Sequence, residues 1–291
     1  MNMHTNAPLV HPMGLLHSQR DCRKKGFAEI PIDPNRIDTV IKSIIEGMRR
    51  MTDSEADQKR FAASVIGRDE MGWDRGAGLW RRAKDESKFF YHLHGDQPNK
   101  DALSGIPEYE SFFEGCDLLN TYAHQLVIRV AEMFDMHDRK NGTAYPSSLA
   151  EKFRNGTVVT RVLRYLERSE RSVDAAIHLD RSGMTVHWYS SHPGLAIIDN
   201  RGHPQRIRET ALDTIALFPG KKFAATTRGV YGPGTLHGVR AERNDGVRAD
   251  RFAVVTFVHP RLDPEDVIFL KEKKDAYERY ERDHDSVLAN F

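Results

Sequence analysis

The chain has 291 residues, of which 39% are hydrophobic and 29% are charged, so it can bury one large core and we expect a single domain. Its formal net charge of +1 excludes a strong field that would gather nucleic acid or an anionic membrane, and we expect neither as a partner. The two cysteines, Cys22 and Cys116, lie outside any CxxC pair, which argues against a disulfide framework and indicates a reducing cytoplasm. No apolar run approaches the roughly 20 residues that cross a bilayer, and the N-terminus lacks the apolar core of a signal peptide.

The first half of the chain reads mostly as helix. GFAEIPI at 26–32 alternates like a short strand, and Asp33-Pro34 then opens a run with apolar residues at helical spacing. The stretch 52–100 is dense in Arg, Asp, Gly and Lys, which predicts irregular structure anchored by its aromatic side chains. Apolar residues at three- and four-residue steps predict a long helix over 107–136. Residues 1–142 are therefore expected to form a mostly helical N-terminal covering region.

Beyond residue 142 the chain becomes a series of short β-prone runs separated by Gly, Pro, Asn and Asp. Many short, closely spaced strands are typical of a sandwich or barrel, and a jelly roll fits their number. A charged terminal helix is expected over 263–291. The predicted fold class is mainly β with flanking helices, with the jelly-roll core over 143–262 of one domain that spans 1–291.

Two His-x-Asp pairs occur, and their surroundings distinguish them. His94-Gly95-Asp96 lies in YHLHGDQPNK, where Gly and Pro predict a turn, so His92, His94 and Asp96 are interpreted as surface or packing residues. His178 and Asp180 lie in DAAIHLD, which reads as a strand. Residues two apart on a strand point to the same face, so both of these side chains can reach one ion.

His237, on a later β-prone run, is the candidate third ligand. Two histidines and one carboxylate suit iron(II), because such a set binds one face of the ion and leaves other positions open for reactants. Zinc could also bind these residues. His187, on the run that follows His178, is interpreted as a packing or cavity residue.

Arg251 begins RFAVVTFVHP, and on either face of the predicted strand it would stand among apolar neighbours. An arginine in such a place needs an anion, and its planar fork suits a carboxylate. The anion is either a bound acid or an Asp or Glu of the protein in an internal ion pair. Both alternatives stay open on the sequence alone.

These residues resemble the iron(II)- and 2-oxoglutarate-dependent dioxygenases, in their isopenicillin N synthase-like branch. The resemblance implies a double-stranded β-helix in which His178, Asp180 and His237 bind iron(II). It also implies that Arg251 binds the distal carboxylate of 2-oxoglutarate with help from Tyr165, and that O2 is the second co-substrate. Five segments carry the likeness, in order and nearly in spacing: RVLRYL at 161–166, IHLDRSGMTVHWY at 177–189, HPGLAII at 192–198, TLHGVRAE at 235–242 and RFAVVTFVHP at 251–260.

Three departures from the family pattern concern 2-oxoglutarate. The Arg-x-Ser signature of the family reads Arg251-Phe252-Ala253, so the supporting hydroxyl is missing. Leu163 stands where an asparagine often precedes the tyrosine by two residues. The loop between His237 and Arg251 is slightly long for the family, and its Arg248 is a second candidate for binding the carboxylate.

The function implied by the resemblance is oxidation of a small molecule by hydroxylation, desaturation or ring closure, in secondary metabolism, with release of succinate and CO2. Two alternatives stay open. One is an iron oxidase of the same fold that does not use 2-oxoglutarate, and the other is a metal-binding jelly-roll sensor without turnover. The substrate cannot be read from the sequence, because loops and covering helices select it in this architecture.

Overall fold

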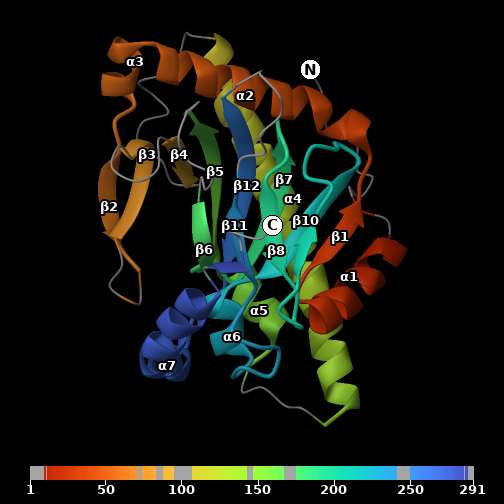
Figure 1. Cartoon of the computed structure of the whole chain (residues 1–291). Coiled ribbons are helices and arrows are strands. Elements are labelled where there is room, and N and C mark those ends of the chain that lie inside the picture. Colours follow the sequence, from red (N-terminus) through yellow and green to blue (C-terminus); the bar gives the residue numbers. More distant parts are fainter. Residues whose placement is uncertain are drawn as a thin grey trace.

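The strands of the chain form two antiparallel sheets (Figure 1). This computed structural model describes residues 10, 12–69, 71, 74–82, 88–94, 107–142, 147–166, 175–240, 250–284 and 286–287. The larger sheet contains β1 (Ala28–Pro31), β2 (Ser64–Arg68), β3 (Asp74–Arg82), β4 (Lys88–His94), β5 (Thr157–Tyr165), β7 (Met184–Ser190), β10 (Thr214–Pro219) and β12 (Arg251–His259). The smaller sheet contains β6 (Ala175–Leu179), β8 (Leu195–Ile198), β9 (Pro204–Arg206) and β11 (Leu236–Val239).

Successive core strands cross from one sheet to the other. β5, β7, β10 and β12 belong to the larger sheet, whose order is β1-β10-β7-β12-β5-β4-β3-β2. The strands between them in the chain belong to the smaller sheet, whose order is β6-β11-β8-β9. This alternation winds the chain into a double-stranded β-helix, or jelly roll, and the predicted fold class is confirmed.

The central strand β12 is buried on both faces. It pairs with β5 on one side and β7 on the other. Phe252, Val254 and Val258 pack into the main hydrophobic core beneath the helices. Ala253, Val255 and Phe257 form a second cluster with Leu163 and Tyr165 of β5 on the opposite face, the interior of the barrel. The interior face therefore carries the side chains available to a ligand.

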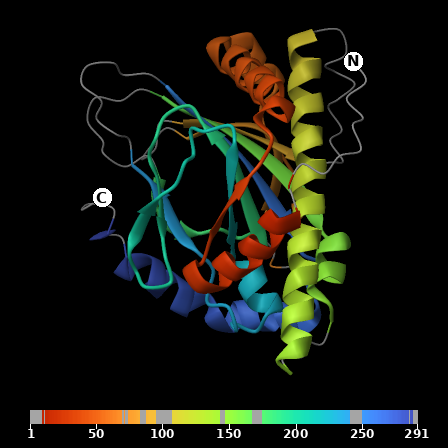
Figure 2. The same ribbon diagram turned by 90° about the vertical axis from the view of Figure 1, so that its right-hand side faces the viewer.

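Helices cover the outer face of the larger sheet. These are α1 (Pro12–Lys25), α2 (Asp38–Asp53) and the long α4 (Pro107–Lys140), which runs along one side of the strands (Figure 2). The helix predicted over 107–136 and the strand predicted within 26–32 are both present. Residues on one face of α4 are fully buried in the main core, among them Phe112, Cys116, Leu119, Val127 and Val130.

The prediction of irregular structure over 52–100 is wrong for the described part of that stretch. It contains α3 (Glu55–Arg60) and strands β2, β3 and β4, and β4 pairs along its whole length with β5. In β4, Phe89 and Tyr91 point toward the helices, whereas Phe90 and His92 point toward the barrel interior. The sequence does not reveal this alternation, because both faces of the strand carry aromatic residues. The N-terminal region thus supplies strands to the sheet as well as helices, and its boundary at residue 142 stays a prediction.

Short helices and the C-terminal helix close the lower end of the barrel. They are α5 (Leu149–Arg154), α6 (Lys221–Thr226) and α7 (Pro264–Asp283), the last of which was predicted within 263–291. Glu281 of α7 accepts a hydrogen bond of 2.8 Å from the backbone nitrogen of Leu179 and pairs with Lys221 at 2.7 Å. α7 therefore braces β6, the strand that carries His178.

In the described parts of the chain, no helix has the length and hydropathy needed to span a membrane.

We expect Lys152→Ala to lower the free energy of unfolding by about 3–5 kcal/mol, the usual cost of leaving a buried charge without its partner. Lys152 is 5% exposed and forms ion pairs with Asp266, which is 1% exposed, and with Asp263 at 2.8 Å. These pairs join α5 to the first turn of α7. Urea denaturation measures the effect, with the exposed Lys271→Ala as control, and equal stability of the two variants would contradict the prediction.

Candidate metal centre

Strand pairing brings the three predicted ligands together. β11 pairs with β6 so that His237 lies directly opposite His178, and Asp180 follows the last residue of β6. One donor atom from each of the three residues lies within 4.8 Å of the other two. The Nε2 atoms of His178 and His237 lie 3.6 Å and 3.5 Å from the two carboxylate oxygens of Asp180. Among the described residues, this is the one cluster of three such side chains with ligand spacing.

Backbone carbonyls orient both imidazoles. Nδ1 of His178 lies 2.8 Å from the carbonyl oxygen of Ala176, and Nδ1 of His237 lies 3.1 Å from that of Thr235. A carbonyl can only accept, so each Nδ1 carries the hydrogen and each Nε2 keeps its lone pair toward Asp180. The hydroxyl of Thr185 donates to Asp180 Oδ2 at 2.6 Å. Fixing the other nitrogen in this way is how proteins orient histidine ligands to a metal.

The charge states of the cluster suit a cation. Burial alone would raise the pKa of the Asp180 carboxyl, but the nearby imidazoles of His237 and His178 outweigh it and hold the pKa below its usual value. Burial lowers the pKa of His237 to about 4. Burial would also lower the pKa of His178, but the adjacent Asp180 outweighs it and holds that pKa above its usual value. At neutral pH Asp180 and His237 therefore have the carboxylate and neutral imidazole forms in which these side chains bind metals.

Arg251, the predicted carboxylate-binding residue, has an internal partner. Its Nη2 lies 2.5 Å from Glu209 Oε2 and donates to Ser190 Oγ at 2.7 Å, and its Nε donates to the carbonyl of His192 at 3.0 Å. Both charged side chains are buried, with 6% and 3% exposed. The internal ion pair, one of the two alternatives that the sequence left open, is therefore present. Arg248, the second candidate, lies outside the described residues.

One nitrogen of Arg251 remains without a hydrogen bond. Nη1 is buried and has no hydrogen-bond partner among the described residues, whereas Glu209 also accepts from the backbone nitrogens of Gly194 and Leu195, at 2.5 Å and 2.6 Å. Burial would raise the pKa of Glu209, but Arg251 and these hydrogen bonds hold it below its usual value. Glu209 is thus a fixed carboxylate, and Arg251 has one donor group left to offer.

Tyr165 lies next to Arg251, as the resemblance implies. The two residues are directly opposed on β5 and β12, and the guanidinium carbon is 5.3 Å from the centre of the tyrosine ring. The next interior pair in the same ladder is Leu163 opposite Ala253. Two of the three departures from the family pattern, Leu163 and Ala253, therefore fall at one position of the sheet, where an apolar contact replaces two polar groups.

A cavity of about 710 Å³ opens beside the three clustered residues. His178 and Asp180 lie in its wall together with interior residues of β4 and β5, whereas Arg251 and Tyr165 are not among the described residues that line it. The cavity reaches Leu163 and Lys88, and Lys88 is directly opposed to Tyr165. Leu163 and Lys88 thus mark the end of the cavity that is remote from the three clustered residues, and Arg251 lies just beyond this end.

Sequence reasoning missed the contribution of β4 to this cavity. His92 and His94 line it, and His94 is buried with its Nε2 3.0 Å from the carbonyl oxygen of Gly76, so the surface position expected for it is wrong and the packing role is right. Asp96 lies outside the described residues. The period-two spacing of Lys88, Phe90, His92 and His94 is the signal that could have found this wall. His187 is not a member of the cluster; it is buried 4.0 Å from Glu209.

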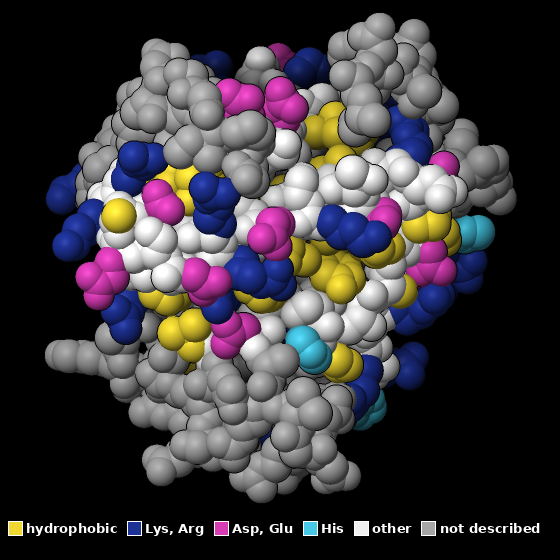
Figure 3. Space-filling view, turned by 90° about the horizontal axis from the view of Figure 1, so that it is seen from above, with side chains coloured by type: hydrophobic (Ala, Val, Ile, Leu, Met, Phe, Trp, Pro, Cys, Tyr) yellow, Lys and Arg dark blue, Asp and Glu magenta, His cyan; other side chains and the backbone are white. Residues whose placement is uncertain are grey.

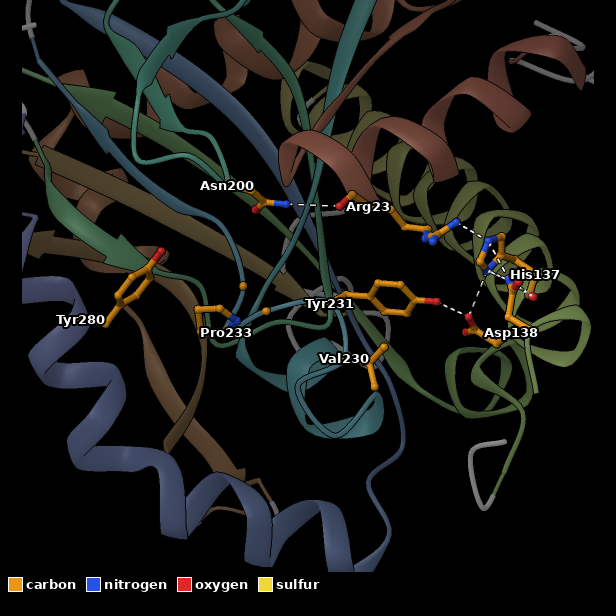
Figure 4. A pocket seen from close by; sticks show the side chains of 11 residues that line it. Arg23, His137, Asp138, Asn200, Val230, Tyr231, Pro233 and Tyr280 are labelled. Atoms are coloured by element: carbon orange, nitrogen blue, oxygen red, sulfur yellow. Dashed lines mark hydrogen bonds and ion pairs between the residues drawn. The ribbon is translucent and has the colours of Figure 1, made fainter. Parts of the chain in front are cut away.

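A second cavity, of about 560 Å³, lies away from this cluster between the C-terminal ends of α1 and α4 and the turn before β11 (Figure 4). Tyr231, in that turn, donates its hydroxyl hydrogen to Asp138 at the end of α4, and Asp138 lies 3.3 Å from His137. The hydroxyl of Thr235 donates to the carbonyl of Gly26. These contacts tie the turn to two helices, and the same turn leads directly to His237.

Comparisons with known proteins were made by sequence and by structure. No protein-family model matches the chain, and no curated protein sequence matches it. Solved structures do match. The Arabidopsis thaliana dioxygenase for auxin oxidation 1, in complex with 2-oxoglutarate, has a TM-score of 0.66 and 13% identity over 86% of this chain and 88% of that one. A Caulobacter crescentus protein assigned to the 2OG-Fe(II) oxygenase family has a TM-score of 0.64 and 18% identity over 90% and 93% of the two chains.

A third match is a full-length Neurospora crassa protein in complex with alpha-KG and 5-formyluracil, with a TM-score of 0.62 and 16% identity over 87% of this chain and 82% of that one. At these identities the likeness concerns the backbone, and it extends over nearly the whole length of each protein. The resemblance inferred from the sequence is thereby confirmed at the level of the fold. The chain has the fold of the 2OG-Fe(II) oxygenases.

Proposed function

We propose that the chain is an iron(II)- and 2-oxoglutarate-dependent oxygenase that oxidises a small molecule with release of succinate and CO2. The observation that carries the proposal is the cluster of His178, Asp180 and His237 on paired strands beside an open cavity. Two structural neighbours were solved with 2-oxoglutarate or alpha-KG, and one of them also holds a small pyrimidine, which supports this class of reaction. A role in secondary metabolism is part of the proposal.

The three residues fit an iron(II) ion. Their donor set is two imidazole nitrogens and one carboxylate, the combination known for iron oxygenases that keep open positions on the metal. Asp180 is 8% exposed, and the groups that pair with its charge are the two histidines of the cluster, so a bound cation would balance it. With 2-oxoglutarate and O2, the iron would supply the oxidising chemistry.

Arg251 and Tyr165 fit the distal carboxylate of 2-oxoglutarate. The buried Nη1 of Arg251 is the observation behind this assignment, because a buried donor without an acceptor is costly and a bound carboxylate would remove that cost. Tyr165 lies against the same guanidinium. Glu209 holds Arg251 in place through Nη2, which leaves Nη1 as the donor group that a bound carboxylate would meet.

The remaining interior residues exclude water. Val159, Leu163 and Phe257 line the cavity and present apolar surface between the cluster and the far end of the sheet. Apolar side chains next to a bound anion strengthen the electrostatic contacts to it and shield reactive species from solvent. The chain's own part in the reaction is therefore to position the reactants and to shield them.

A second candidate function is an iron oxidase of the same fold that does not use 2-oxoglutarate. The Arg251–Glu209 ion pair favours it, because an arginine neutralised by a fixed carboxylate binds a second carboxylate less strongly than a lone arginine would. The contact of Leu163 with Ala253 points the same way. Conversion of 2-oxoglutarate to succinate separates the two functions. The remaining alternative, a metal-binding sensor, would bind the metal but convert neither 2-oxoglutarate nor a substrate.

We expect His237→Ala to abolish stoichiometric iron(II) binding, since a set of one histidine and one carboxylate leaves the ion weakly held. Thr185→Val should weaken iron binding by about 10–100-fold, the usual effect of removing a group that orients a ligand. Anaerobic equilibrium dialysis measures both, with His203→Ala, an exposed histidine remote from the cluster, as control. Iron binding that persists in His237→Ala would overturn the ligand assignment.

We expect the wild-type protein, with iron(II), ascorbate and O2, to convert 2-oxoglutarate to succinate even without its substrate. Arg251→Gln should raise the 2-oxoglutarate concentration that this conversion requires by about tenfold or more, because a charge-assisted hydrogen bond is lost. Arg251→Gln also leaves Glu209 buried and unpaired, which should lower stability by about 3–5 kcal/mol.

The double variant Arg251→Gln with Glu209→Gln separates these two effects. It removes both charges, so most of the lost stability should return while the weakened use of 2-oxoglutarate persists. Urea denaturation and succinate formation are measured on the same preparations. If the double variant uses 2-oxoglutarate as well as the wild type does, Arg251 is a structural partner of Glu209 only, and the second candidate function gains.

A further inference from the structure

Among the described residues, the lining of the cavity beside the metal centre contains more basic than acidic side chains. Its described lining includes seven lysines and arginines but three carboxylates, Asp69, Asp180 and Glu281. Two of these carboxylates form ion pairs within the wall, Asp69 with Lys222 at 3.1 Å and Glu281 with Lys221 at 2.7 Å, and Asp180 belongs to the metal cluster. By contrast, acidic and basic side chains are interspersed on the face of the molecule seen from above (Figure 3).

Arg161 is a cation of this wall that packs against two aromatic rings. It lies on the interior face of β5, directly opposite His92 of β4 on one side and Val255 of β12 on the other. Its Nε lies 2.6 Å from His92 Nε2. Its guanidinium carbon is 4.6 Å from the ring centre of Phe257 and 5.5 Å from that of Phe90. Two aromatic faces and a histidine therefore hold the side chain in one orientation.

The position of Arg161 relative to the metal centre follows from the strand register. Phe257, over which Arg161 lies, is directly opposite Thr185 of β7, and Thr185 donates its hydroxyl hydrogen to Asp180. His178 lines the same cavity. A group bound to Arg161 would thus lie nearer to the cluster than one bound to Arg251, which lies farther along β12, beyond the Leu163–Ala253 contact.

Phe90 and Phe257 define what a ligand of Arg161 would touch besides the charge. Phe90 lies nearly parallel to Trp80, with an interplanar angle of 4° and ring centres 6.1 Å apart, so its ring is itself supported from behind. Both phenylalanines line the cavity. Rigid aromatic faces beside a planar cation suit a flat, unsaturated molecule with a carboxylate at its edge.

We propose that Arg161 binds a carboxylate of the substrate, and that the substrate is a small organic acid whose flat, unsaturated part packs on Phe90 and Phe257. The proposal rests on the proposed function for the identity of the site, and it makes Arg161 the residue that selects the substrate class. Arg251 then binds the co-substrate and Arg161 binds the substrate, at two different positions along the interior face of the larger sheet.

The test compares matched acids and amides as ligands of the protein loaded anaerobically with iron(II) and 2-oxoglutarate. The probes are phenylacetate against phenylacetamide and indole-3-acetate against indole-3-acetamide, with dissociation constants measured by ligand-observed NMR. The wild type should bind each acid about tenfold or more tightly than its amide, the effect of a charge-assisted hydrogen bond in a sheltered site. No preference for either acid would overturn the proposal.

Variants assign the preference to one residue. Arg161→Gln and Arg161→Met should both abolish it, and Arg161→Met keeps an unbranched apolar stem between the two rings, so at least one folded variant is expected. Arg161→Lys should restore part of the preference, because it returns the charge without the planar fork. Arg154→Gln, which removes an exposed cation from α5, is the control for net charge. A preference that survives both Arg161→Gln and Arg161→Met overturns the proposal.

Two further outcomes separate this inference from the proposed function. If Arg161→Gln weakens 2-oxoglutarate binding and leaves the preference for acids intact, Arg161 anchors the co-substrate and the inference fails. If the wild type prefers the acids through Arg161 but never forms succinate, the proposed function fails while the assignment of a carboxylate to Arg161 stands. The binding measurement needs no turnover, which keeps the two results independent.

Discussion

The antiparallel pairing of β6 with β11 is the constraint on which the site depends. It places His178 opposite His237 within one ladder, so their separation is set by backbone hydrogen bonds and not by side-chain flexibility. Asp180 follows at the end of β6, and the hydroxyl of Thr185, across the barrel on β7, fixes its carboxylate. Both sheets must therefore be folded against each other before three ligands can exist, which couples any metal binding to the completed jelly roll.

The ends of β6 and β11 are held by elements that lie far apart in the sequence. Glu281 of α7 accepts from the backbone of β6, and α7 is itself anchored to α5 through Lys152. On the other strand, Tyr231 ties the turn before β11 to α4, and Thr235 both donates to the backbone of Gly26 and accepts from His237. Helices that contribute no ligand thus limit how far the ligands can move, as a preorganised site requires.

The sequence predicted those parts of the site that a single strand determines. His178 and Asp180 share a short β-prone run, so period two was enough to place them on one face, and Arg251 opens another such run among apolar neighbours. Glu209 could not be found in this way, because it lies outside the regular strands and meets Arg251 only when the two sheets close. Arg161 and His92 were missed for a related reason, since their contact requires β4 to pair with β5 across a long stretch of chain.

The two interior arginines differ in their surroundings, and this difference bears on what each can bind. Arg251 and Glu209 together carry no net charge, so a carboxylate that arrives at Nη1 gains hydrogen bonds and little long-range attraction. Arg161 stands in a wall whose described residues include more cations than carboxylates, so an anion near it gains from neighbouring cations as well as from contact. A dianionic co-substrate would gain from both the hydrogen bonds of Arg251 and the cations near the metal centre. One of its ends would be attracted by the metal and the other would be oriented by Arg251. A singly charged organic acid has no second carboxylate for the far end, and the balance of charge favours its binding at Arg161, beside the metal.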